Sequence, residues 1–174
     1  MEPRRVGKFE KVSYEEFEKA VKEILPEKNM DIKSVYENIK IPCRGTALAA
    51  GYDFFAPFDI VLKPKETIKI PLGIRCWMEE NYFLAIVPRS SFGFKFRLQL
   101  DNTIGIIDAD FSDSKMKGHM MIKITNDTVE DKILEIKAGQ GFVQGIFLPY
   151  AITYDDDVHN FREGGFGSTD KQNT

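Results

Sequence analysis

The sequence predicts an all-β domain, built as a sandwich, jelly roll or barrel, with one helix near its N-terminus. From residue 34 onward, short β-type segments alternate with turn residues such as Pro, Gly, Asn and Asp. This rhythm is typical of antiparallel β folds and not of βαβ units. A length of 174 residues fits one domain with a full hydrophobic core. After Tyr150 the pattern stops, and the polar, glycine-rich remainder predicts a flexible C-terminal arm.

The first expected element is a helix over residues 13–25. Ser13 and Glu16 form a capping-box signature, and apolar side chains recur at helical spacing until Pro26 ends the pattern. Strands are then expected at residues 35–41, 58–62, 67–70, 74–78, 82–87, 96–100, 104–111, 120–125, 132–136 and 142–148, many of them separated by turn signals. The expected organisation is an N-terminal helical extension at 1–33, a β domain at 34–154 and an arm at 155–174.

Composition excludes several classes of partner. The net charge is −3, with Lys and Arg scattered along the chain, which argues against non-specific nucleic-acid binding. No apolar run is long enough to cross a membrane, and residues 1–9 lack the apolar region of a signal peptide. Cys43 and Cys76 have no further Cys or His at zinc-ligand spacing. We therefore expect a soluble, reduced, cytoplasmic protein.

The stretch at residues 102–113 has the strongest catalytic character. Turn-tolerant Asn102 and Gly105 lie between the β-type runs 96–100 and 106–111, which predicts a hairpin. Asp108 would then end a largely apolar strand, where a poorly solvated carboxylate can serve as a base. Asp110 and Asp113 add negative charge that suits a site using a divalent cation. The alternative interpretation of Asp108 is a turn-capping aspartate.

Four further segments carry residues with a possible role in a site, and two of them have groups that suit phosphate binding. Arg89-Ser90-Ser91 after an expected strand is a plausible anion-binding loop, although its composition is ordinary for a loop. Asp53 and Gln144 are polar residues in otherwise apolar strands, and a structural cross-strand bond is the common role of such a glutamine. Residues 161–169 surround Phe166 with glycines, which suits a lid that closes on a nucleotide or, alternatively, a mobile C-terminus.

Together these stretches resemble the five ordered motifs of the trimeric dUTP diphosphatases (dUTPases), a β-clip family with a jelly-roll-like subunit. The similar segments are 44–54, 88–95, 102–111, 139–144 and 162–169, in the family's order. The resemblance as a whole covers residues 41–169, and the third and fifth motifs are the most specific. The resemblance implies a homotrimer with shared active sites and the Mg²⁺-dependent hydrolysis of dUTP to dUMP and pyrophosphate.

The resemblance also implies a role for each matching residue. Asp108 would activate the attacking water, and Asn102 with the backbone at Ile106 and Ile107 would recognise uracil. Phe111 would pack under the deoxyribose, and Met121 would border the same pocket. Phosphate contacts are implied for Arg89, Ser90, Ser91 and Gln144. Arg162, Gly167, Ser168 and Thr169 would close on the γ-phosphate, with Phe166 over the base. Asp53 would lie near the water shell of Mg²⁺.

The sequence departs from the family pattern at a few positions. Phe111 replaces the usual Tyr, Ser91 replaces a common Gly, and Gly141 stands where a basic residue is frequent. Residues 114–117 form a short insertion. An alternative function is that of a dCTP deaminase, an enzyme that shares this fold. Residues 120–125, however, lack the glutamate that the deamination reaction needs. A jelly-roll interaction module that binds nucleotide or a regulatory protein without turnover is a second alternative.

Overall fold

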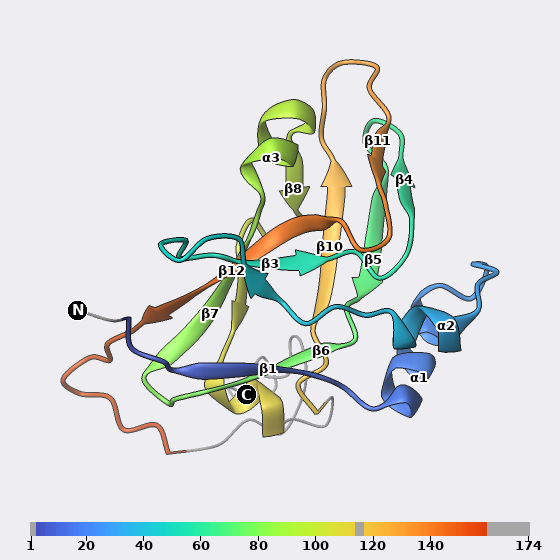
Figure 1. Cartoon of the computed structure of the whole chain (residues 1–174). Helices are drawn as coiled ribbons and strands as arrows, with labels where there is room; N and C mark the ends of the chain where they lie inside the picture. Colours follow the sequence, from blue (N-terminus) through green and yellow to red (C-terminus); the bar gives the residue numbers. More distant parts are fainter. Residues whose placement is uncertain (1–2, 114–116, 160–174) are drawn as a thin grey trace, which may run out of the picture.

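The computed structural model describes residues 3–113 and 117–159 and consists mostly of short strands with few helices (Figure 1). This jelly-roll-like β architecture confirms the predicted fold class. The strands are β1 (Gly7–Lys11), β2 (Cys43–Arg44), β3 (Tyr52–Phe55), β4 (Ile60–Leu62), β5 (Thr67–Pro71), β6 (Ile74–Met78), β7 (Tyr82–Pro88), β8 (Leu98–Leu100), β9 (Gly105–Ile107), β10 (Met121–Asn126), β11 (Leu134–Ile136) and β12 (Gly141–Pro149). The helices are α1 (Tyr14–Ile24), α2 (Ile32–Glu37), α3 (Ser90–Phe96) and the 3₁₀ turn η1 (Ala109–Asp113).

Two sheets position the candidate site. The larger has five strands in the order β2-β3-β12-β7-β9, and a three-stranded sheet has the order β5-β10-β8. Antiparallel pairs β1-β6 and β11-β4 complete the fold. Alternating apolar residues of these strands form the core, with Phe54, Leu84, Ile124 and Phe142 at most 1% exposed. Because the side-chain period of a strand is two, this alternation fixes which face of each strand is buried.

The predicted helix at 13–25 is confirmed as α1, with a complete capping box between Ser13 and Glu16. The predicted strand at 35–41 is wrong, because residues 32–37 form α2. Asp31 caps α2 by accepting a hydrogen bond from the Ser34 N–H at 3.1 Å, and the Tyr36 ring packs against Phe17 of α1. A local cap and a tertiary contact therefore outweigh the β propensity of Val35 and Tyr36.

The predicted strand at 96–100 and the predicted Arg89-Ser90-Ser91 loop are also corrected. Residues 90–96 form α3, Arg97 ends it in the left-handed conformation, and only 98–100 form β8. Phe92 and Phe96 lie four residues apart, stack with ring centroids 6.3 Å apart and are both buried. Helical spacing is what brings these two rings into the core together. β1 was missed altogether, since its sequence GKFEK contains a single apolar residue.

The region 96–111 was predicted as a hairpin, and the structure divides it between two sheets. β8 pairs with β10, whereas β9 pairs with β7. Residues 101–104 cross from one sheet to the other, and η1 replaces the second half of the predicted strand at 104–111. The predicted turn is therefore present, but the two strands that flank it pair with different strands and do not form a hairpin.

His119 is buried where α1 covers the β-sheet core. Its Nε2 accepts a hydrogen bond from the Gly73 N–H at 2.9 Å, and its side chain is 3% exposed. Burial lowers the pKa of His119 to about 4, although nearby Glu16 acts in the opposite direction. The imidazole must therefore be neutral in the folded protein. His119 therefore has a structural role in this part of the core.

We expect the stability of the protein to fall as the pH drops from about 6.5 toward 4, because the unfolded chain binds a proton at His119 that the folded chain does not. The loss of stability from this group between pH 6.5 and pH 4 amounts to about 3 kcal/mol. Chemical denaturation at pH 7.5 and pH 4.5 measures it. His119→Gln, which does not titrate, should flatten the pH dependence. An unchanged pH profile in that variant would refute the assignment.

Candidate active site

A cavity of about 370 Å³ lies between β10 and the segment that runs from β8 into β9. Asn102, Gly105, Ile106 and Ile107 line one side, and residues 120–123 line another. The structure thus brings together four residues predicted to surround the base, namely Asn102, Ile106, Ile107 and Met121. The walls are mainly apolar, with a few polar groups from the turn and from β10. This is the usual composition of a small-molecule site.

Backbone groups of the turn at residues 101–104 lie close to the cavity, and some of them form hydrogen bonds within the turn and not within a sheet. The Thr103 N–H donates to the Leu100 carbonyl at 2.8 Å, and the Ile104 N–H donates to the Asn102 carbonyl at 2.7 Å. Gly105 lies opposite Ile86 of β7, and a Cβ on Gly105 would lie 3.1 Å from the Ile86 Cβ. The glycine therefore lets β9 lie close against β7 beside the cavity.

Asp108 lies directly after β9 and is partly buried. Its carbonyl accepts a hydrogen bond from the Phe111 N–H at 3.1 Å, which begins the η1 turn. The Phe111 side chain is 3% exposed and belongs to the hydrophobic core. Within the described residues the ring is therefore covered by the chain itself, and Phe111 is not among the residues that line the cavity.

A second cluster gathers Arg89, Asp53 and Gln144 at the other end of β7. Arg89 Nε pairs with Asp53 Oδ1 at 3.1 Å, and Arg89 Nη1 donates to the Gly141 carbonyl at 3.1 Å. Gln144 on β12 is the register partner of both Asp53 and Val87. A Cβ on Gly141 would lie 2.9 Å from Arg89 Nη1. The glycine at this position, where a basic residue was expected, therefore leaves room for the Arg89 guanidinium.

Ser90 and Ser91 begin α3 next to this cluster, and both are exposed. Their exposed hydroxyl groups follow Arg89 directly in the chain, and hydroxyl groups beside a guanidinium suit anion binding. The predicted site residues Arg162, Phe166, Gly167, Ser168 and Thr169 lie outside the described residues, as does most of the insertion at 114–117.

The antiparallel register of β7 and β9 separates the two groups within one chain. Ile107 lies opposite Leu84, near the start of β7, whereas Arg89 follows the end of that strand. From Leu84 to Arg89 the strand advances about 16 Å, at about 3.3 Å per residue. Asp108 follows Ile107 and continues away from Arg89. A single chain therefore does not bring Asp108 next to the Arg89 cluster.

Comparison with known proteins shows the family of this chain. The family model described as dUTPase matches residues 37–170. The deoxyuridine 5'-triphosphate nucleotidohydrolase of Lactococcus lactis is 35% identical over 147 residues, which cover 82% of this chain and 97% of that protein. The chain belongs to the dUTPase family.

Other dUTPases extend this likeness. The enzyme of Haemophilus ducreyi is 32% identical and is matched over 99% of its length by 83% of this chain. The crystal structure of dUTPase from Streptococcus mutans aligns with a TM-score of 0.62 at 28% identity, over 83% of this chain and 97% of that one. The dUTPase from phage phi11 of S. aureus shares the fold, with a TM-score of 0.58 at 24% identity. The relatives are hydrolases, and the chain is an enzyme of this class.

The cavity wall contains three charged residues that were not predicted from the sequence as site residues. Lys69, Asp101 and Lys123 all line the cavity. Lys69 and Lys123 are register partners on β5 and β10. The polar positions of residues 121–126 could have indicated that one face of this strand is exposed, but its partner strand and the nearby carboxylate depend on long-range pairing.

Within the described residues, no helix is long and apolar enough to span a membrane.

We expect Gly51→Ala to weaken nucleotide binding with little loss of stability. A Cβ on Gly51 would overlap the amide oxygen of Gln144, closer than a real contact allows, and the flexible Gln144 side chain would turn away. The resemblance to dUTPases implies that Gln144 contacts a phosphate, and loss of that one hydrogen bond predicts a KM for dUTP raised about tenfold. Steady-state kinetics and thermal unfolding measure the two effects. Gly45→Ala is a matched control, because no atom lies within 4 Å of its Cβ position. Equal KM values in both variants would contradict the prediction.

Proposed function

We propose that this dUTPase-family enzyme hydrolyses dUTP to dUMP and pyrophosphate, with Asp108 activating the water that attacks the α-phosphate. The observation that carries the proposal is the mainly apolar cavity beside Asn102 and β9, with a carboxylate directly at the end of that strand. Uracil presents one N–H between two carbonyl oxygens. The Asn102 amide and the backbone groups of the turn offer the complementary donors and acceptors, and the narrow turn would exclude the methyl group of thymine.

The proposal includes Mg²⁺ as the cofactor. Among the residues at 3–113 and 117–159, no group of three or more His, Cys, Asp or Glu is arranged to hold a metal ion. This fits Mg²⁺, which prefers phosphate oxygens and water to an all-protein site. Asp53, whose carboxylate is already held by Arg89, would hydrogen-bond to a water of the ion. When bound with the substrate, the ion would offset negative charge on the phosphates.

We further propose a homotrimer in which Asp108 of one subunit acts with the Arg89 cluster of another. The separation of about 16 Å between Leu84 and Arg89 along β7 supports this, since phosphates next to Arg89 would be out of reach of Asp108 in the same chain. The arm residues Arg162, Phe166, Gly167, Ser168 and Thr169 would complete the site over the γ-phosphate and the base. The cytoplasmic location and a regulatory protein partner also remain predictions.

The rival deamination of dCTP has less support at this cavity. A deaminase needs an acid on the strand after the turn to activate water at the pyrimidine ring, and β10 reads MIKITN. Asp101 is an acid on the wall, but its two oxygens are engaged by Thr125 and Lys123.

Pyrophosphate release from dUTP, with dCTP and dTTP as controls, tests the proposal directly. We expect rapid release from dUTP with Mg²⁺ and little from either control. Release of ammonia from dCTP would favour the deaminase, and binding of dUTP without any release would favour a regulatory module. Either result would overturn the proposed function.

A further inference from the structure

The turn at residues 101–104 carries the proposed base-binding groups but has little secondary structure of its own. β8 ends at Leu100 and β9 begins at Gly105 in a different sheet. Between them, Thr103 adopts a φ of +65°, in the left-handed region that β-branched residues rarely enter. Such a conformation persists only where surrounding contacts determine it. The geometry of the cavity wall therefore depends on what holds this turn.

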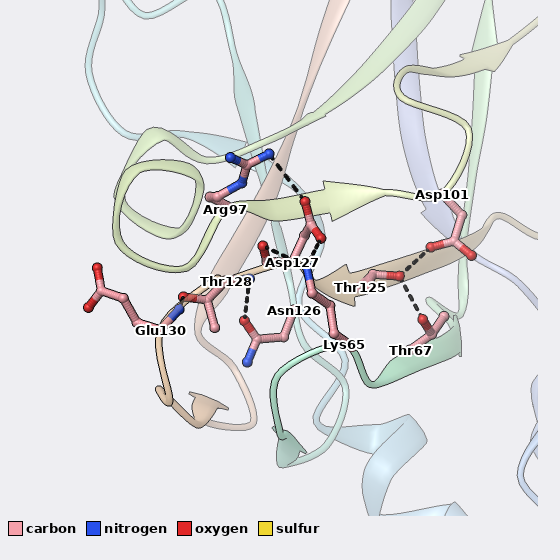
Figure 2. A network of polar contacts seen from close by, with 9 residues as sticks. All are labelled: Lys65, Thr67, Arg97, Asp101, Thr125, Asn126, Asp127, Thr128 and Glu130. Atoms are coloured by element: carbon pink, nitrogen blue, oxygen red, sulfur yellow. Dashed lines mark hydrogen bonds and ion pairs between the residues drawn. The ribbon is translucent and has the colours of Figure 1, made fainter.

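Asp101 ties the turn to the neighbouring sheet through both its backbone and its carboxylate. The Asp101 N–H donates to the Lys123 carbonyl at 3.1 Å. Its Oδ1 accepts a hydrogen bond from Thr125 Oγ1 at 2.7 Å, and its Oδ2 pairs with Lys123 Nζ at 2.7 Å. Figure 2 shows the carboxylate turned toward Thr125, which in turn lies beside Thr67 of β5.

The hydroxyl groups form a chain with one direction. Thr67 and Thr125 are register partners, and their Oγ1 atoms are 2.6 Å apart. Because Asp101 can only accept when ionised, Thr125 donates to Asp101 and Thr67 donates to Thr125. Burial raises the pKa of Asp101, but the hydrogen bonds from Lys123 and Thr125 outweigh it and keep that pKa below its ordinary value. The carboxylate stays charged and the chain of donors stays in place near neutral pH.

The network also controls charge at the cavity. Asp101 and Lys123 both line it, beside Asn102. Their pairing sets one negative charge against one positive charge, so the carboxylate repels an anionic nucleotide less than an unpaired one would. The Asn102 amide and backbone groups are then left as the recognition elements for the base.

We infer that Asp101 is a positioning residue for base recognition, which fixes the turn at 101–104 on β10 and so sets the affinity and base selectivity of the cavity. The inference rests on the proposed function. It predicts a loss in nucleotide binding and in discrimination between bases, and not in the chemical step, because the proposed base Asp108 follows β9, which pairs with β7 and lies in a different sheet from β10.

The test compares Asp101→Asn with Asp127→Asn. Asp127 is a matched control that directly follows β10, where it pairs with Lys65 and Arg97 (Figure 2) but does not line the cavity. We expect Asp101→Asn to raise the KM for dUTP about tenfold, with kcat within about twofold, and to reduce the preference for dUTP over dCTP. Asp127→Asn should leave KM and the preference unchanged. Thermal unfolding of both variants measures any general loss of stability.

A second pair of variants tests the hydroxyl chain. Thr125→Val keeps the shape but removes the donor, and should raise KM, whereas Thr125→Ser should recover the lost affinity. Equal KM values for Asp101→Asn and Asp127→Asn would overturn the inference and leave the proposed function intact. If the parent enzyme showed no turnover of dUTP, the proposed function would fail. Calorimetric affinity for a non-hydrolysable dUTP analogue would then decide the role of Asp101 by the same comparison.

Discussion

Asp108→Asn should abolish the hydrolysis of dUTP while leaving nucleotide binding largely intact. The amide keeps the size and much of the hydrogen bonding of the carboxylate but cannot take a proton from water. Removal of a positioned general base typically costs ~10²–10⁴ in rate. Pyrophosphate release measures turnover, and calorimetry with a non-hydrolysable dUTP analogue measures binding.

Asp131→Asn provides the control for this variant. Asp131 is an exposed carboxylate on the loop between β10 and β11, away from the cavity. The Asp131→Asn variant should hydrolyse dUTP at the rate of the parent enzyme. A near-normal kcat in Asp108→Asn would exclude Asp108 as the base. Loss of binding together with turnover would indicate that the residue mainly maintains the shape of the turn.

Two inactive variants should restore activity when their subunits are mixed. Asp108→Asn retains the Arg89 cluster, and Arg89→Ala retains Asp108. If each site takes Asp108 from one subunit and Arg89 from another, random reassembly of equal amounts should rebuild about a quarter of the sites in a symmetric trimer. Subunits are dissociated in mild denaturant, mixed and refolded together, and pyrophosphate release is measured against each variant refolded alone.

The outcome depends on whether the site is shared. A site built within one chain would show no recovery on mixing, because every chain would carry one defect. Arg89→Ala also leaves Asp53 without its ion pair, so Gln144→Ala serves as a second partner for Asp108→Asn. Sedimentation of the parent enzyme should show a trimer, and an active monomer would contradict the proposed arrangement.

The dominant features of the fold were predictable because they depend on local patterns. Ser13 and Glu16 specify the start of α1 through a cap within four residues of chain. Alternating apolar residues likewise specify strands such as β5, β6 and β10, whose faces are fixed by burial on one side. The resemblance to dUTPases rested on short ordered motifs, and the family match confirms it.

The errors arose where a contact distant in sequence decided the local structure. The β-branched and aromatic residues of α2 have strand propensity, but Tyr36 is held by its contact with Phe17 of α1. α3 forms because Phe92 and Phe96 enter the core together. β8 and β9 look like the two arms of a hairpin, yet each pairs with a different strand. Propensity is a weak guide wherever tertiary packing offers a better partner.

The same division applies to the candidate site. Residue types and their local context were enough to propose which groups carry the chemistry, namely Asp108 at the end of an apolar strand, Asn102 in a turn, and Arg89 with Gln144. The distances between these groups depend on the tertiary structure, which gathers Asn102, Ile106 and Met121 around one cavity. It also brings Asp101 into contact with β10. Along β7 it separates Asp108 from Arg89. The physical reason is that residue chemistry is local, whereas strand register and sheet order are set by burial and hydrogen bonding between segments far apart in the chain.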